Sequence, residues 1–265
     1  MIEIGISPVA FTIGPISVAW YGIMVALAVL VLVLWMLREV RQRANLTNDT
    51  VLSVALVGIP SGVIFARLLH VADRWDYYSQ HLGQIVGGSG LTIYGAVLGA
   101  ALGVWIYSWV RRISFGYLAD VLAPGIILAQ AIGRVGCTLN GCCYGIESRL
   151  PWAVVYTHPE SLGPIGVPVH PTQFYELIYN LIVFAVLFKL RGRFKPDGSL
   201  FLIYLSLYSL WRFSVGFLRE GTPFLFFGFH QAQVIALIML VIAIPILAVK
   251  ARWVRGDTEA PSAAD

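Results

Sequence analysis

Three arginines lie in stretches of the chain that are otherwise apolar enough to cross a membrane: Arg67, Arg134 and Arg212. A cation near the bilayer centre costs roughly 2.5–3.5 kcal/mol on insertion scales. Such a charge is usually kept because it faces a cavity lined by protein and binds an anion there. Tyr208 precedes Arg212 by one helical turn. The sequence therefore predicts a site for a negatively charged group at membrane depth.

The segment around Arg134 combines its guanidinium group with four glycines, Gly133, Gly136, Gly141 and Gly145. Glycines permit close approach of the backbone, and we expect exposed amides here that bind an anion together with the guanidinium. The alternative is a glycine-rich helix end that packs tightly on a neighbour while Arg134 extends to the membrane surface.

Glu176 lies one turn into another apolar stretch, where a carboxylate needs a partner. Arg134 or Arg212 could be that partner, and so could a reacting proton; a purely structural ion pair is the alternative. His170 shortly precedes the same stretch, and alone it is more typical of an interfacial polar residue than of a base.

The remaining membrane-associated charges are predicted to be structural. Arg67 has His70 and Asp73 on the same helical face. Arg219 and Glu220 follow the sixth apolar stretch, and we expect them to pair in water.

Composition identifies the class of protein that must position these residues. Of 265 residues, 58% are hydrophobic and 12% are charged, and the mean hydropathy is +0.78. Soluble domains carry about 25% charged residues, so we expect an all-α polytopic membrane protein. The net charge of +4 is then better explained by membrane topology than by nucleic acid, which is not an expected partner.

Seven stretches are long enough for a membrane helix, which needs about 20 apolar residues. The first is too long for a signal-peptide core. We predict one integral membrane domain over residues 1–254 and a disordered cytoplasmic tail over 255–265. The predicted spans are 16–37, 51–71, 91–110, 117–135, 174–190, 200–218 and 231–249.

Basic residues alternate between the loops and indicate an orientation. Connections after the first, third, fifth and seventh spans hold twelve of the eighteen lysines and arginines. By the positive-inside rule the amino terminus is outside and the carboxyl terminus is cytoplasmic. The long connection over 137–172, rich in glycine and proline, is then a small extracytoplasmic head, irregular or short-stranded. Its length favours a functional role.

Cys137, Cys142 and Cys143 are the only cysteines. Their spacing matches no common zinc pattern, so neither a metal nor another cofactor is expected. Two alternatives are small buried apolar side chains, or one disulfide on the outer face from Cys137 to Cys142 or Cys143.

Five segments, taken together and in this order, resemble the bacterial prolipoprotein diacylglyceryl transferases. They are residues 20–22, 90–99, 133–145, 170–176 and 208–212. The resemblance implies an enzyme of the bacterial cytoplasmic (inner) membrane that uses phosphatidylglycerol and the signal peptide of a preprolipoprotein. The diacylglyceryl group would move to the thiol of a lipobox cysteine, forming a thioether and releasing glycerol phosphate.

The resemblance also implies roles for particular residues. Arg134 and Arg212 would stabilise charge on the leaving phosphate, and Tyr94 and Glu176 are the other catalytic candidates. Both substrates carry apolar tails, so entry from the surrounding membrane lipid is expected. The implied substrate-binding residues are Arg134, Tyr21, Gly133, Gly136, Asn140, Gly141, Gly145, His170, Gln173, Tyr175 and Tyr208.

The chain departs from the family pattern at four positions. Tyr94 stands where a histidine is common, and an unperturbed tyrosine is a poor base at neutral pH, so proton removal could fall to Glu176 or His170. Cys137, Cys142 and Gly216 replace an asparagine and two glutamates respectively.

Two other classes of protein compete with the enzyme. A transporter of a small anion would be expected to show broken helices and inverted repeats, and no repeat is visible. A seven-span receptor has no role for the glycine-rich arginine segment.

Overall fold

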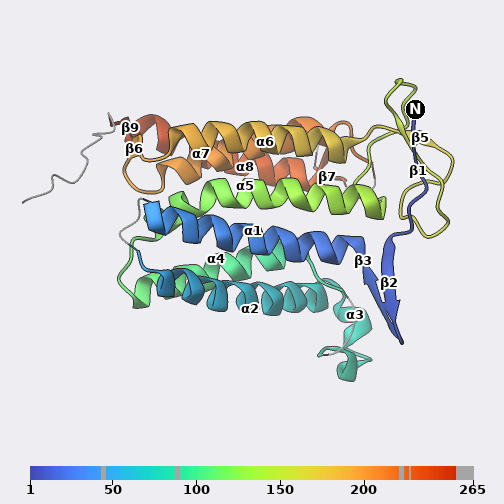
Figure 1. The fold of residues 1–265 in the computed structure, drawn as a ribbon, viewed down its shortest axis with the longest axis horizontal. Coiled ribbons are helices and arrows are strands. Elements are labelled where there is room, and N and C mark those ends of the chain that lie inside the picture. Colours follow the sequence, from blue (N-terminus) through green and yellow to red (C-terminus); the bar gives the residue numbers. More distant parts are fainter. Residues whose placement is uncertain (43–45, 87–89, 221–223, 227, 255–265) are drawn as a thin grey trace, which may run out of the picture. The chain divides into compact units, whose positions relative to one another are not determined.

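The computed structural model describes residues 1–42, 46–86, 90–220, 224–226 and 228–254, so the predicted disordered tail over 255–265 lies outside the described residues. Within them, seven helices are long and apolar enough to cross a membrane, which confirms the all-α polytopic class (Figure 1). These helices are α1 (Trp20–Gln42), α2 (Asn48–Asp73), α4 (Ile93–Val110), α5 (Phe115–Asn140), α6 (Thr172–Leu190), α7 (Ser199–Gly216) and α8 (Gln231–Lys250).

Several predicted boundaries are wrong, and those of the first and fourth helices differ most. The first helix begins at Trp20 rather than at residue 16, because Ile16–Ala19 forms strand β3, which pairs antiparallel with β2 (Val9–Ile13). The fourth helix continues to Asn140 rather than ending at 135, so the long connection begins at Gly141.

The end of α5 is a Schellman motif. Gly141 has φ +74° and donates its N–H to the Thr138 carbonyl, while the Cys142 N–H reaches the Cys137 carbonyl at 3.1 Å. A glycine in the left-handed region satisfies the last carbonyls of a helix in this way. Cys137 is therefore held in the last turn of the helix, and Cys142 follows immediately after it.

The chain forms two compact units, and the second comprises Met36–Leu118. Its main elements are α2 and α4, joined through α3 (Trp75–Tyr78) and the 3₁₀ helix Leu82–Gln84. Arg67 donates hydrogen bonds to the carbonyls of Ile85 at 2.9 Å and Gly90 at 3.0 Å. Its guanidinium thus holds the connection between the helices, as expected for a structural arginine.

The first unit comprises Met1–Trp35 and the chain from Ala119 onwards. Here α5, α6 and α7 lie side by side (Figure 1), and one apolar core joins them. α8 packs against α7. The buried core residues are Ala123, Ile127, Val183, Leu187, Leu200 and Tyr204.

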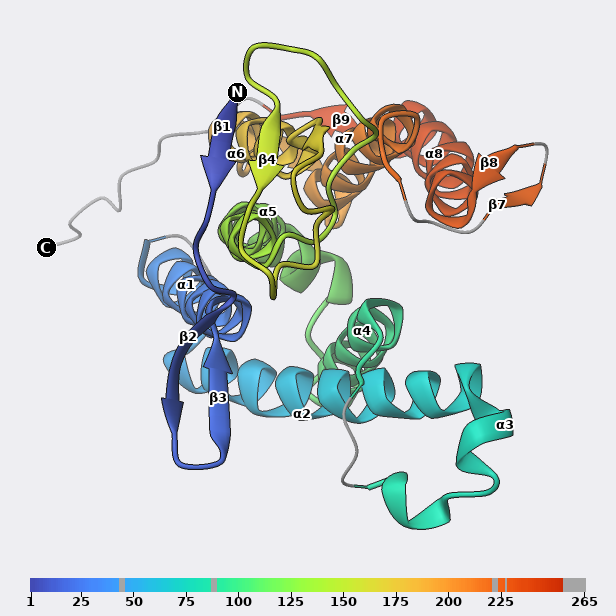
Figure 2. The same ribbon diagram turned by 90° about the vertical axis from the view of Figure 1, so that its right-hand side faces the viewer.

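A small stranded head lies at the end of the unit where α5 ends and α6 begins. Strand β4 (Val154–Tyr156) pairs with β5 (Pro168–Val169), as the predicted short-stranded connection allows. Strand β1 (Ile2–Ile4) adds to β4 in parallel, a pairing that was not predicted from the sequence. Figure 2 shows β1 and β4 lying across the ends of α5 and α6.

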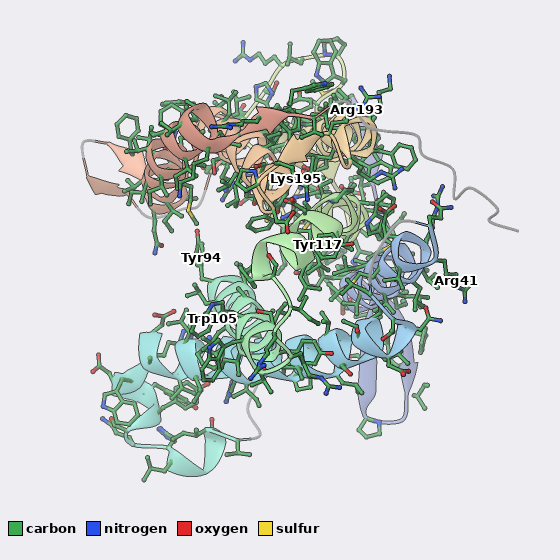
Figure 3. All side chains as sticks on the ribbon, turned by 90° about the vertical axis from the view of Figure 1, so that its left-hand side faces the viewer. Arg41, Tyr94, Trp105, Tyr117, Arg193 and Lys195 are labelled. Atoms are coloured by element: carbon green, nitrogen blue, oxygen red, sulfur yellow. The ribbon has the colours of Figure 1, made fainter. Side chains whose placement is uncertain are left out.

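Short strand pairs also flank α7 and α8. β6 (Phe194–Lys195) pairs with β9 (Arg252–Trp253), and β7 (Phe224–Phe226) pairs with β8 (Phe229–His230). Figure 3 shows Arg193 and Lys195 at strand β6, which precedes α7.

Asp120 of α5 caps the first turn of α7. Its carboxylate accepts the N–H groups of Gly198 and Phe201, each at 2.8 Å. We expect Asp120→Ala to lower the free energy of unfolding by about 0.5–2 kcal/mol, as loss of a helix cap does. Thermal unfolding in detergent measures this. Asp197→Ala is the control: its exposed pair with Lys195 should contribute less than about 1 kcal/mol, and an equal loss in both variants would contradict the cap.

Candidate functional site

A buried carboxylate lies between two guanidinium groups at the junction of α5, α6 and the chain after α7. Arg134 Nη2 lies 2.5 Å from Glu176 Oε1, and Arg219 Nη2 lies 3.4 Å from Glu176 Oε2. The Glu176 side chain is fully buried, and 16% of the Arg134 side chain is exposed. Arg134 is therefore a partner of Glu176. The sequence had left Arg134 and Arg212 as the two candidate arginines.

The prediction that Arg219 pairs with Glu220 in water is wrong. Arg219 is 7% exposed, because the chain after α7 turns inward and pairs with the outer loop through the Gly145–Arg219 bridge. Its pKa is lowered by burial first, and then by the nearby cations of Arg212 and Arg134, while Glu176 opposes the shift. The position of Arg219 at a helix end gave no sign of this partner.

Arg212 completes the cluster from α7. Its Nη1 is buried without a hydrogen-bond partner among the described residues, and so is Nε of Arg219. Tyr208, one turn earlier, lies within electrostatic range of all three arginines and of Glu176. Arg134 and Arg219 contact the carboxylate, and Arg212 lies near Arg219, so these four groups carry a formal charge of +2. We call Arg134, Glu176, Arg212 and Arg219 the arginine cluster.

Excess positive charge in a buried setting is unfavourable without an anion, because each unpaired ion loses its hydration. Arginine binds phosphate and carboxylate groups through two parallel hydrogen bonds. Buried guanidinium nitrogens that lack a partner are the donors that such a ligand would use. The cluster therefore fits an anionic group.

Further buried polar residues lie along the helices of the cluster. Asn180 is fully buried and its amide has no hydrogen-bond partner among the described residues. Gln130 donates a hydrogen bond to the Tyr204 hydroxyl at 3.0 Å. Neither residue was predicted from the sequence, although each lies four residues from a candidate: Asn180 follows Glu176, and Gln130 precedes Arg134. Spacing of four places side chains on one helical face.

The expected cradle of exposed amides is wrong for the four glycines. Gly133 and Gly136 lie inside α5, where amides serve the helix itself. The amides of Gly141 and Gly145 bond the carbonyls of Thr138 and His170. At Gly145 a Cβ would lie 2.5 Å from the Leu218 carbonyl, so this glycine permits close packing. Their predicted role in binding substrate stays a prediction.

The start of α6 fastens the outer loop. Gln173 donates hydrogen bonds to the Cys142 carbonyl at 2.8 Å and to the Tyr156 hydroxyl at 3.1 Å. Burial raises the pKa of Tyr156, and the hydrogen bond from Gln173 opposes this. His170 Nδ1 lies 3.4 Å from the Tyr175 hydroxyl. The predicted residues His170, Gln173 and Tyr175 thus lie together at the start of α6. His170 contacts Tyr175 at the outer loop and is not a member of the arginine cluster.

Three other predicted residues have different surroundings. Tyr21 of α1 packs against Gly136 through its Cα. The Asn140 carbonyl accepts the Leu162 N–H at 3.2 Å. Tyr94 lies in the first turn of α4, in the other compact unit, with 39% of its surface exposed (Figure 3). Its catalytic role stays a prediction.

The cysteines are free thiols whose sulfurs lie within 4.8 Å of one another. Cys137 is buried and accepts a hydrogen bond from Arg134 Nη1 at 3.9 Å, whereas Cys143 is exposed. The alternative of three buried apolar cysteines is therefore wrong for Cys143, and no disulfide joins these residues.

Gly216 faces a buried glutamine rather than open space. A Cβ at Gly216 would lie 2.4 Å from Gln233 Cγ. Gln233 of α8 donates a hydrogen bond to the Phe213 carbonyl at 3.1 Å. The glutamate that the family resemblance led us to expect at this position would therefore clash, and a polar group from α8 occupies the space.

Fold and site together define a polytopic membrane protein with a buried arginine cluster on α5, α6, α7 and the chain that follows α7. The profile of the prolipoprotein diacylglyceryl transferase family matches residues 8–249, and the chain belongs to this family. It is a multi-pass protein of the inner membrane.

Several relatives share nearly the whole length of the chain, and each carries the name phosphatidylglycerol–prolipoprotein diacylglyceryl transferase. A protein of Dehalococcoides mccartyi (strain ATCC BAA-2266 / KCTC 15142 / 195) is 50% identical over 252 residues, covering 95% of this chain and 96% of its own. Relatives from Clostridioides difficile (strain 630) and Listeria innocua are 39% and 37% identical, covering 87% and 91% of this chain and 90% and 89% of their own.

Proposed function

We propose that this transferase moves the diacylglyceryl group of phosphatidylglycerol to the thiol of a lipobox cysteine in a prolipoprotein, with the arginine cluster binding the phosphate. The observation that carries the proposal is the excess of buried positive charge: two guanidinium groups pair with one carboxylate, and a third, that of Arg212, lies near Arg219. A phosphodiester brings one negative charge and several acceptor oxygens to this place. The identity of the two substrates comes from the family description and from the names of the relatives.

The reaction that follows from this binding is a displacement. The thiol loses its proton, because the thiolate is the nucleophile. The sulfur then bonds to the glyceryl carbon while the bond from that carbon to the phosphate oxygen breaks, so a thioether forms and glycerol phosphate leaves. Charge builds on the phosphate oxygens, and preorganised guanidinium groups stabilise it.

The proposed orientation places the amino terminus and the head outside and the carboxyl terminus in the cytoplasm. It rests on the distribution of basic residues between the loops. The arginine cluster then lies toward the outer leaflet, because the head adjoins the ends of α5 and α6. The single membrane domain over 1–254 and the substrate-binding roles of the predicted residues belong to the same proposal.

The test is transfer of label from phosphatidylglycerol, labelled in its acyl chains, to a lipobox peptide by the purified chain. We expect a labelled peptide, and none from a peptide whose lipobox cysteine is replaced by serine. Absence of labelled peptide, combined with arginine-dependent uptake of an anion into vesicles, would favour a transporter and overturn the proposal.

Tyr94→Phe separates two roles of the hydroxyl group. If Tyr94 takes the thiol proton, the rate should fall by about 100-fold or more, the scale of a general base. The variant keeps the ring, so packing at the start of α4 should be preserved. The measurement is the transfer rate at saturating lipid, with Tyr107→Phe, later on the same helix, as the control. A rate within twofold of the unsubstituted protein would exclude the Tyr94 hydroxyl as the base.

A further inference from the structure

The three cysteines form a cluster that the proposed reaction does not use. They come from two places, the last turn of α5 and the two residues after Gly141. Their sulfurs nevertheless lie within 4.8 Å of one another. Three convergent thiols are a ligand set for a soft metal ion.

The sulfur positions are close to those that a metal requires. A zinc–sulfur bond is about 2.3 Å, so sulfurs that share one zinc ion lie about 3.8 Å apart. The observed sulfurs therefore need to approach by about 1 Å at most. Rotation of the side chains after the helix end supplies a movement of this size.

The backbone that carries these thiols is fixed by its own contacts. Gln173 holds the Cys142 carbonyl at 2.8 Å, and Thr172 holds the Cys143 carbonyl at 2.7 Å. Cys143 also has φ +65°, a conformation that costs energy in a residue other than glycine and clusters at functional sites. The start of α6 thus holds the backbone of Cys142 and Cys143 in place.

The surrounding charge favours an anionic complex. Binding of a divalent ion releases three thiol protons and leaves a metal trithiolate with a net charge of −1. Arg134 already donates a hydrogen bond to the Cys137 sulfur at 3.9 Å. Such outer-shell donors orient thiolate ligands and tune the metal.

We infer that Cys137, Cys142 and Cys143 form a binding site for a thiophilic metal ion such as Zn²⁺, which ties the end of α5 to the outer loop. The spacing along the chain predicted no metal, because only the fold brings the helix end and the loop together. Because Cys143 is exposed, water can reach this side of the cluster. This site does not depend on the transfer reaction.

The test is titration of the full chain, reduced and freed of metal by a chelator in detergent, with Cd²⁺. We expect a sulfur-to-metal charge-transfer band that saturates at about one Cd²⁺ per chain, with proton release, and that Zn²⁺ displaces. C143S removes the exposed ligand with little change in size. Its Cd²⁺ affinity should fall by more than the roughly 10–100-fold that loss of an outer-shell partner costs.

His158→Ala is the matched control, because this histidine lies on the same loop but outside the cysteine cluster. We expect the charge-transfer band and the Cd²⁺ affinity of this variant to be unchanged. A second readout is thermal unfolding: Zn²⁺ should raise the Tm of the original chain and not that of C137S/C142S/C143S. Absence of the band, equal affinity in C143S, or a disulfide that persists under reductant would each overturn the inference. If the triple variant does not fold, C143S alone decides.

Discussion

Alanine at Arg134 or at Arg212 should lower the rate of diacylglyceryl transfer at least about 100-fold, the scale of losing one donor to a developing oxyanion. Arg134 pairs with Glu176, and Arg212 has a buried nitrogen without a partner among the described residues. Each alanine substitution removes one cation from the proposed phosphate site. The measurement is the initial rate of label transfer by purified variants matched for amount in the membrane fraction.

Lysine variants and a surface arginine sharpen this test. Arg134→Lys and Arg212→Lys keep the charge but lose the forked donor geometry, so we expect them to recover only part of the activity. Arg149→Ala removes an exposed arginine of the outer loop and should leave the rate within about twofold, as surface substitutions usually do. Normal turnover in an alanine variant would remove that arginine from the mechanism.

Glu176→Gln should abolish transfer and destabilise the protein. The substitution keeps the size of the side chain but leaves Arg134 and Arg219 without their carboxylate. Breaking a buried ion pair by removing one partner costs about 3–5 kcal/mol. Thermal unfolding in detergent and the transfer rate are measured together, and Glu147→Gln, an exposed carboxylate on the outer loop, is the control and should match the original chain.

A double variant distinguishes two roles of Glu176. If the carboxylate balances the charge of the arginines, then Arg219→Gln in the Glu176→Gln background restores the formal charge to +2. Part of the lost stability should return, since residues that share one ion-pair network are coupled. If stability returns but transfer does not, Glu176 or Arg219 also acts in the reaction. Failure of the second substitution to restore any stability would contradict the role in charge balance.

The sequence by itself determined the membrane class and the seven helices, and it singled out three charges of the candidate site. Long apolar stretches must form helices in lipid because no water satisfies their backbone. Arg134, Arg212 and Glu176 were recognisable because a charge inside such a stretch is costly and needs a reason. These inferences depend only on local composition, so they needed no knowledge of which helices are neighbours.

Only the tertiary structure decided which residues meet. Arg219 follows its helix and reads as a surface charge, yet the inward turn after α7 places it against Glu176. The cysteine spacing resembles no metal pattern, yet a Schellman motif and the start of α6 bring the three sulfurs together. Spacing along one helix fixes which side chains share a face, whereas contacts between elements depend on how loops return, and local sequence carries little of that information.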